Sequence, residues 1–354
     1  MSSSSAERRR RALMLALLPA LPAVAPAAPA PGTYPVLREP APPAARAASA
    51  ALLALAWAGP RLVAVGERGL ILTSEDQGRR WVQARSPVRS TLTAVQFVDA
   101  QLGWAVGHLG VILHSRDGGL SWVRQLDGLQ LPELYAQAAQ GDEAATLARQ
   151  LAADGPDKPW LALSFQDARR GLVVGAYNLA LATEDGGAHW QPISARLPNP
   201  RSLHLYGVAR QGETVLLAGE QGLLMRSNDG GSHFEPLASP YRGSWFGVQA
   251  LQRGELLLHG LRGSVQLSRD QGSSWQPLDT GLGVSITAVV ERADGSLLIA
   301  SQAGELLQRA PGAASLQRWP APPLPPLAAL AALPEGGAVV AGLRGVMRVE
   351  PPLR

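Results

Sequence analysis

The residues of this sequence that could do acid–base chemistry are five regularly placed aspartates. Each follows a serine or threonine by two positions and precedes a glycine by two positions; they are Asp76, Asp117, Asp185, Asp229 and Asp270. Paired carboxylates hydrolyse glycosides only when they lie about 5–10 Å apart. These aspartates are separated by 41, 68, 44 and 41 residues, and each stands in a turn of its own. We therefore expect the five carboxylates to be dispersed, each bonding to its own backbone.

Other catalytic and metal-binding patterns are missing from the sequence. The six histidines show no H-E-x-x-H or comparable ligand spacing, and no G-x-S-x-G nucleophile motif is present. Cysteine is absent, which excludes disulfides, thiolate metal sites and a cysteine nucleophile. We predict that the protein is not an enzyme, with no catalytic residue, no metal and no cofactor.

The aspartates belong to an eight-residue motif: hydroxyl, any residue, Asp, any residue, Gly, two further residues and an aromatic. The motif predicts a hairpin turn, because Asp and the hydroxyl bond nearby N–H groups and Gly takes the positive-φ position. An apolar run precedes each copy, and the aromatic residue begins the next strand and buries its ring. The five aromatic residues are Trp81, Trp122, Trp190, Phe234 and Trp275.

A period of about 40 residues organises the chain around these motifs. Within one repeat, apolar strands are expected at residues 92–97, 103–107 and 111–114, with a fourth strand starting at Trp122. Two degenerate repeats follow, and the last one ends without a fourth strand. Four-stranded units repeated radially form a propeller. We predict an all-β fold, a seven-bladed β-propeller of four-stranded antiparallel blades, over residues 51–354.

Residues 31–50 form a Pro/Ala-rich lead-in. An open ring would expose the edges of its first and last blades. We predict that Tyr34 to Arg38 supplies the missing strand by pairing outside residues 346–349. The alternative is that residues 31–50 form a loose linker.

The long interval between the second and third motifs contains an insertion at residues 132–158. Its composition favours two short helices, broken near Gly141 and Asp142. We expect a helical insertion between blades two and three. It is either a partner contact or a surface insertion packed on the adjoining blade.

Arginines gather in the turns opposite the aspartate motifs. In a four-stranded blade, the turns between strands two and three lie on the same face as the connections between blades. Six arginines fall in these segments: Arg68, Arg89, Arg201, Arg242, Arg262 and Arg344. We predict that they form a docking face for an acidic protein partner. The alternative is that Arg is the default polar loop residue, since Lys158 is the only lysine.

The N-terminal residues 1–30 are predicted to be a signal peptide. Four arginines at positions 8–11 precede an apolar run and small residues. Pro19 and Pro22 interrupt the run, so we expect no transmembrane span in the mature chain; an uncleaved anchor is the alternative. The formal charge of +4 falls to +1 without Arg8–Arg11 and Glu7, which gives no support for nucleic-acid binding. We expect an exported monomer, periplasmic or associated with the envelope.

The eight-residue motifs resemble Asp-box repeats, also called bacterial neuraminidase repeats, and are named Asp boxes below. The full repeat, from Gly103-Trp104 through Asp117 to Trp122, resembles the photosystem II stability/assembly factor family. This resemblance implies a non-catalytic seven-bladed propeller, lumenal in photosynthetic organisms, that binds an assembly intermediate of a membrane complex through an Arg-rich face. It extends over residues 33–350.

Some features differ from that family or leave a second interpretation open. The signal segment is bacterial in style, the helical insertion is extra, and the last two repeats are degenerate. The alternative function is a glycan-binding or sialidase-like Asp-box propeller. The Arg-Ile-Pro motif of sialidases is absent, and seven blades are expected here rather than six.

Overall fold

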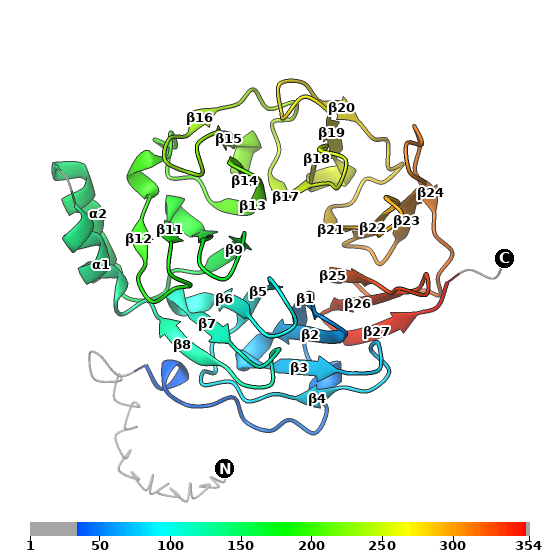
Figure 1. The fold of residues 1–354 in the computed structure, drawn as a ribbon, viewed down its shortest axis with the longest axis horizontal. Helices are drawn as coiled ribbons and strands as arrows, with labels where there is room; N and C mark the ends of the chain where they lie inside the picture. Colours follow the sequence, from blue (N-terminus) through cyan, green and yellow to red (C-terminus); the bar gives the residue numbers. More distant parts are fainter. Residues whose placement is uncertain (1–33, 140, 352–354) are drawn as a thin grey trace, which may run out of the picture. The chain divides into compact units, whose positions relative to one another are not determined.

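The computed structural model describes residues 34–139 and 141–351, and its folded unit begins at Pro35. In this part of the chain, seven antiparallel sheets follow one another around a ring (Figure 1). Six of the described sheets have four strands and the last has three, and strands that are consecutive in the chain are neighbours in each sheet. The predicted seven-bladed β-propeller is confirmed.

Among the described residues, two α-helices lie between the second and third blades. Blade 1 consists of β1 (Leu52–Ala58), β2 (Arg61–Gly66), β3 (Ile71–Ser74) and β4 (Val82–Gln83). Blade 2 consists of β5 (Leu92–Phe97), β6 (Gly103–Gly107), β7 (Ile112–Ser115) and β8 (Val123–Leu126). The helices α1 (Leu131–Ala138) and α2 (Asp142–Asp154) follow. Blade 3 consists of β9 (Trp160–Phe165), β10 (Gly171–Gly175), β11 (Ala180–Thr183) and β12 (Gln191–Pro192).

The remaining blades follow without further helices of α type in the described residues. Blade 4 consists of β13 (Leu205–Gln211), β14 (Thr214–Gly219), β15 (Leu224–Ser227) and β16 (Glu235–Pro236). Blade 5 consists of β17 (Trp245–Ala250), β18 (Leu256–Gly260), β19 (Val265–Ser268) and β20 (Gln276–Pro277). Blade 6 consists of β21 (Ile286–Glu291), β22 (Leu297–Ser301), β23 (Leu306–Arg309) and β24 (Gln317–Arg318). Blade 7 consists of β25 (Leu327–Ala332), β26 (Ala338–Gly342) and β27 (Gly345–Val349).

The alternating strand directions give the propeller two distinct faces. One carries the Asp boxes and the turns between the first and second strands of each blade, and we call it the box face. The other carries the turns between the second and third strands, such as Glu67–Gly69, and the connections between blades; we call it the connection face. The second strands lie deepest, and β6, β10, β18, β22 and β26 are buried throughout.

The predicted ring-closing strand is wrong. Pro35–Leu37 is a 3-10 turn, and the described sheet of blade 7 ends at β27. The lead-in bonds to the first two blades instead: the Val36 carbonyl accepts from the Arg89 N–H at 2.7 Å, and the Ser86 carbonyl accepts from the Ala41 N–H at 3.1 Å. Proline has no N–H to donate to a strand ladder, which weakens any strand containing Pro35.

Side-chain packing closes the ring where a shared strand was expected. Blade 7 lies against blade 1 (Figure 1), and Leu62 of β2 shares a buried cluster with Leu333 and Val339. The indole N–H of Trp57 donates to the Ala332 carbonyl at 3.1 Å. The 3-10 turn Ala47–Ser49 contacts β27. Burial of apolar surface therefore joins the two ends of the ring.

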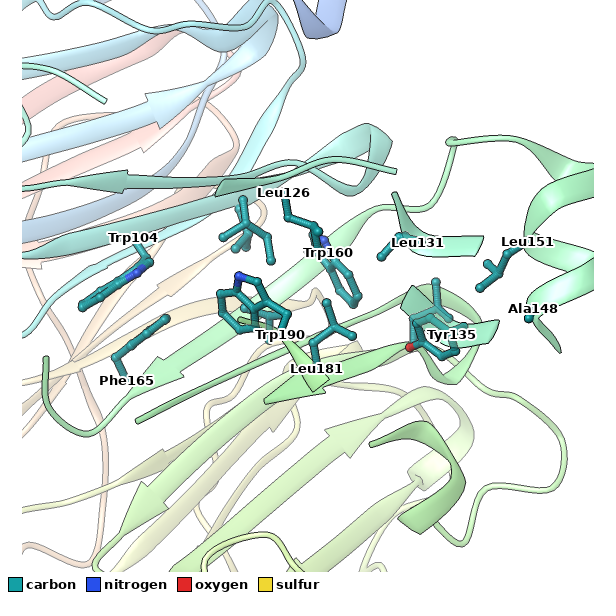
Figure 2. Close-up of a cluster of buried hydrophobic side chains, with 14 residues drawn as sticks. Trp104, Leu126, Leu131, Tyr135, Ala148, Leu151, Trp160, Phe165, Leu181 and Trp190 are labelled. Atoms are coloured by element: carbon teal, nitrogen blue, oxygen red, sulfur yellow. The ribbon is translucent and has the colours of Figure 1, made fainter. Parts of the chain in front are cut away.

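The helical insertion is anchored in the core between blades 2 and 3. Leu131 and Tyr135 of α1 and Leu151 of α2 share a buried cluster with Trp160 and Trp190 (Figure 2). The Tyr135 hydroxyl lies 2.9 Å from the Ser194 hydroxyl. Its burial raises the pKa of Tyr135 to about 12. The insertion thus packs on the adjoining blade, which is the second of the two interpretations given for it from the sequence.

The expected signal peptide, residues 1–30, lies outside the described residues. Among the helices that the structure does describe, none combines the length and the apolar character that crossing a membrane requires.

Candidate functional site

Each Asp box is a turn held by its own hydroxyl. In all five boxes the hydroxyl oxygen accepts from the N–H of the box glycine at 2.8 Å. The same hydroxyl donates to the aspartate at 2.7–3.0 Å. The hydroxyl residues are buried, so this one oxygen pairs a backbone N–H that water cannot reach.

Each box carboxylate accepts hydrogen bonds from donors within its own turn. Each Oδ1 accepts from the N–H four residues later at 2.8–2.9 Å. The His189 N–H, followed by the His189 ring, lowers the pKa of Asp185 to about 2. The Ser274 hydroxyl, with its backbone N–H, lowers the pKa of Asp270 to about 2. A general acid needs a raised pKa, so these groups are unsuited to donate protons near neutral pH.

In four of the five boxes, the residue after the box aspartate links neighbouring blades through its peptide carbonyl. The φ of this residue is positive in all five boxes. The Gln77 carbonyl accepts from Arg348 of blade 7 at 3.0 Å, and the Gln271 carbonyl accepts from Arg226 of blade 4 at 2.9 Å. Gly186 accepts from the indole of Trp104 in blade 2 at 3.2 Å. The boxes therefore contribute to the seams between blades as well as to their own turns.

The six predicted arginines are exposed and stand at the connection-face ends of the strands. Arg68 and Arg262 lie in the 3-10 turns Glu67–Gly69 and Leu261–Gly263, and Arg344 lies in the two-residue turn between β26 and β27. The connections between blades supply the other three, Arg89, Arg201 and Arg242. They come from different blades, so they are distributed around the face and do not form one compact cluster.

Most of these arginines keep an uncompensated charge. Arg89 pairs with Glu39 at 2.8 Å, and Arg201 donates to the neutral amide oxygen of Gln221 at 2.8 Å. For Arg68, Arg242, Arg262 and Arg344, no carboxylate of the described residues lies within ion-pair distance. A partner carboxylate could therefore pair with these guanidinium groups without displacing an internal ion pair.

The connection-face turns share a backbone strain that the sequence analysis missed. Five of them place a non-glycine residue at a positive φ of 51–57°: Arg68, Leu109, Tyr177, Gln221 and Arg262. A left-handed conformation is uncommon for residues other than Gly, Asn and Asp. The sequence does show a repeated pattern at these turns: the second strand of each blade is followed by two residues and then by a glycine or an asparagine. It positions a large side chain at the tip of each turn.

An aromatic row on the connection face was also missed. The rings of Tyr177, His204, Tyr206 and Phe246 follow one another with centroid distances of 4.7, 6.2 and 5.9 Å. Sequence reasoning weighed the tyrosines only as nucleophiles and the histidines only as metal ligands. The signal that could have revealed it is the second residue of the first strand in each blade, which is aromatic in the neighbouring blades 4 and 5, at Tyr206 and Phe246.

Three open clefts of the described surface lie on the box face, away from the predicted arginines. One of about 370 Å³ lies between blades 1 and 2 and is lined by Arg61, Glu75 and Asp117, among others. Another of about 540 Å³ lies between blades 3 and 4, beside Arg169, Arg210 and Asp185. Arg210 is held by the Gln166 amide oxygen at 3.0 Å and the Gly230 carbonyl at 3.2 Å. Groups of three or more potential metal ligands are absent among the described residues.

Comparison with protein families identifies the fold's relatives. A family model described as Photosynthesis system II assembly factor YCF48 matches residues 60–154 and 155–319. The chain belongs to this family. The expected resemblance to photosystem II assembly factors is thus confirmed at the family level.

One curated YCF48 relative matches a short stretch of the chain. It is the Photosystem II assembly lipoprotein Ycf48 of Synechococcus sp. (strain CC9902), 36% identical over 59 residues. The match covers 17% of this chain and 18% of that protein. This chain therefore aligns with about a fifth of the curated relative's length.

Solved structures share the fold at low sequence identity. YCF48 bound to D1 peptide has a TM-score of 0.62 and 16% identity, covering 86% of this chain and 95% of that one. YCF48 from Cyanidioschyzon merolae has a TM-score of 0.64 and 18% identity, covering 89% and 98%. A streptogramin B lyase has a TM-score of 0.66 and 9% identity, covering 86% and 95%. The same fold thus carries both YCF48 proteins and lyases.

Proposed function

We propose that this chain is an exported, non-catalytic scaffold that binds a protein subunit of a membrane complex and assists the assembly or stability of that complex. The arginines of the connection face are the proposed docking residues. Membership in the YCF48 family supports this role, and one structure of similar fold holds YCF48 bound to D1 peptide. We propose that the partner of this chain likewise presents a peptide segment, and that the segment is acidic.

The observation that carries the proposal is the set of exposed arginines on one face. Five of them are free of ion pairs with the described residues, and guanidinium groups form bidentate hydrogen bonds with carboxylates. The box face has carboxylates too, but those of the Asp boxes are occupied by their own turns. Electrostatic complementarity at the connection face would raise the association rate and fix the orientation of the partner.

The experiment is affinity capture of the native protein from its own cell envelope, followed by identification of co-purifying proteins. Wild type is compared with a variant carrying Arg68→Glu, Arg262→Glu and Arg344→Glu. A control carries the same charge change on the box face, at the exposed Arg79, Arg116 and Arg253. We expect wild type and control to capture the same membrane-complex subunit, and the connection-face variant to lose at least tenfold of it.

Two results would contradict the proposal. Equal capture by both triple variants would remove the connection-face arginines from the interaction. Capture of a glycan, with no specific protein, would favour the glycan-binding alternative. Binding must also weaken as salt is added, because exposed charges separated by more than about 8 Å are screened at physiological ionic strength.

A further inference from the structure

The aromatic row lies on the connection face and crosses three blades. Tyr177 is at the tip of the turn between β10 and β11, His204 precedes β13, and Tyr206 and Phe246 are the second residues of β13 and β17. Neighbouring rings meet edge to face, at interplanar angles of 75°, 83° and 80°. Tyr177 is 52% exposed, and the other three rings are partly exposed. The row therefore offers apolar surface that the fold leaves uncovered.

A backbone irregularity sets the two central positions. In every described first strand the register shifts at the second residue, so that residue is bulged. The seven bulged residues are Leu53, Thr93, Leu161, Tyr206, Phe246, Thr287 and Ala328. Bulges re-aim side chains at the rim of a sheet. Aromatic residues occupy this position only in the adjacent blades 4 and 5, which makes one sector of the face distinct.

Hydrogen bonds hold the start of the row in place. The ring Nδ1 of His204 accepts from the Tyr177 N–H at 3.0 Å, and the Glu220 carboxylate accepts from the His204 N–H at 2.8 Å. Tyr177 itself has a φ of 57°, a conformation that a bulky residue rarely adopts. Backbone strain of this kind is concentrated at functional sites.

Two of the proposed docking arginines stand near the row, and both border the turn Glu220–Gly222 of blade 4. Arg201 precedes His204 by three residues, and Arg242 precedes Phe246 by four residues. Both are exposed, and Arg201 donates to the neutral amide oxygen of Gln221. Tyr177 also lies 5.2 Å from the Nζ of Lys158, which is paired with Asp154. The sector thus combines apolar rings with cationic groups at its border.

We propose that the aromatic row anchors an apolar side chain of the partner, while Arg201 and Arg242 bind carboxylates of neighbouring residues of the same segment. The ligand class is an extended peptide with an aromatic or long aliphatic residue between acidic residues. This inference rests on the proposed function and specifies the partner's chemistry. Edge-to-face rings do not form the flat platform on which a sugar stacks, so a peptide side chain suits the row better than a glycan.

The test measures binding of short fluorescent peptides to the purified protein by fluorescence anisotropy. The probes share flanking sequences and carry a central Asp-Phe-Asp, Asp-Ser-Asp or Lys-Phe-Lys. Sialic acid serves as a competitor to detect a glycan site. We expect wild type to prefer the first peptide over the second by about tenfold, because binding removes the phenylalanine ring from water; this preference corresponds to about 1.4 kcal/mol.

Residues from other blades provide replacements that the fold already tolerates. Tyr177→Gln, Tyr206→Thr and Phe246→Thr each insert a residue found at the same place in another blade, namely Gln221, Thr93 and Thr287. Val123→Thr, on the outer strand β8, is the control at a 69% exposed apolar site. The triple variant should lose the preference for phenylalanine and keep the preference for Asp over Lys. The double variant Arg201→Gln, Arg242→Gln should keep the preference for phenylalanine and lose the preference for Asp over Lys.

The outcomes separate the two proposals. Equal binding of the two acidic peptides by wild type overturns the aromatic anchor and leaves the acidic docking face standing. Equal binding of the acidic and lysine peptides overturns both. Displacement of the peptide by sialic acid at low concentration assigns the row to a glycan and also overturns the anchor. Circular dichroism of each variant confirms that it is folded before binding is compared.

Discussion

Arg348 closes the ring, and its replacement tests how the first and last blades are held together. The side chain is 10% exposed and donates from Nη1 to the Gln77 carbonyl of the blade 1 Asp box at 3.0 Å. It also pairs with Glu350 at 2.7 Å. In Arg348→Met the aliphatic stem is retained and both interactions are lost. We expect the free energy of unfolding to fall.

The magnitude follows from the exposure of each partner. A hydrogen bond from a charged donor contributes about 1.5–3 kcal/mol, and the Gln77 carbonyl loses this donor. Glu350 is 66% exposed, so the ion pair adds at most about 1 kcal/mol. The expected loss is therefore about 1.5–4 kcal/mol. Urea denaturation followed by tryptophan fluorescence measures it.

Arg226→Met is a closely matched control. Arg226 holds the equivalent place in the third strand of blade 4 and donates to the Gln271 carbonyl of the next box at 2.9 Å. It also pairs with the exposed Glu235 at 2.7 Å. In the described chain, a covalent connection joins blades 4 and 5, whereas no connection passes from blade 7 to blade 1. Loss of the bond between arginine and carbonyl should therefore open the seam between blades 7 and 1 in Arg348→Met, but not the seam between blades 4 and 5 in Arg226→Met.

Hydrogen–deuterium exchange distinguishes local opening from global loss of stability. In Arg348→Met we expect faster exchange in β1 and β27, and in Arg226→Met we expect unchanged exchange in β15. If β27 shows unchanged exchange and the stability loss is below about 0.5 kcal/mol, the bond to Gln77 does not hold the ring. Equal opening of both seams would refute the reasoning about chain connection.

Two further predictions concern the core and the Asp boxes. Burial lowers the pKa of His259 to about 4 from its ordinary 6.5, so the unfolded chain takes up a proton that the folded chain refuses as pH falls through this window. The free energy of unfolding, measured by urea titration, should therefore decrease from pH 6.5 to pH 4, and His259→Val should make this decrease smaller. A variant with the same pH profile as wild type would contradict this role of His259. Ser115→Ala leaves the buried Gly119 N–H without its acceptor and should lower the free energy of unfolding by about 1–3 kcal/mol in the same assay. The control Ser121→Ala removes an exposed hydroxyl and should cost less. Equal losses in the two variants would show that the buried oxygen has no special role.

The candidate site was only partly predictable. The six arginines could be placed on one face because antiparallel strands of one blade must alternate in direction, which settles the end at which each turn lies. The aromatic row could not be found in this way. Tyr177 and Tyr206 are 29 residues apart in the sequence, and Phe246 is 40 residues further on. Their proximity depends on how two neighbouring blades approach each other and on a bulge that shifts the register.

The sequence by itself determined the Asp boxes, the number of blades and the family. A box is a local structure: Ser115, Asp117 and Gly119 complete their hydrogen bonds within eight residues, so composition and spacing suffice to specify it. Only the tertiary structure decided how the ring closes. The lead-in around Pro35 bonds to the outside of blades 1 and 2, and β27 meets blade 1 through packing and through Arg348. The way in which the ring closes depends on contacts between segments some 270 residues apart, and no local sequence pattern specifies such contacts.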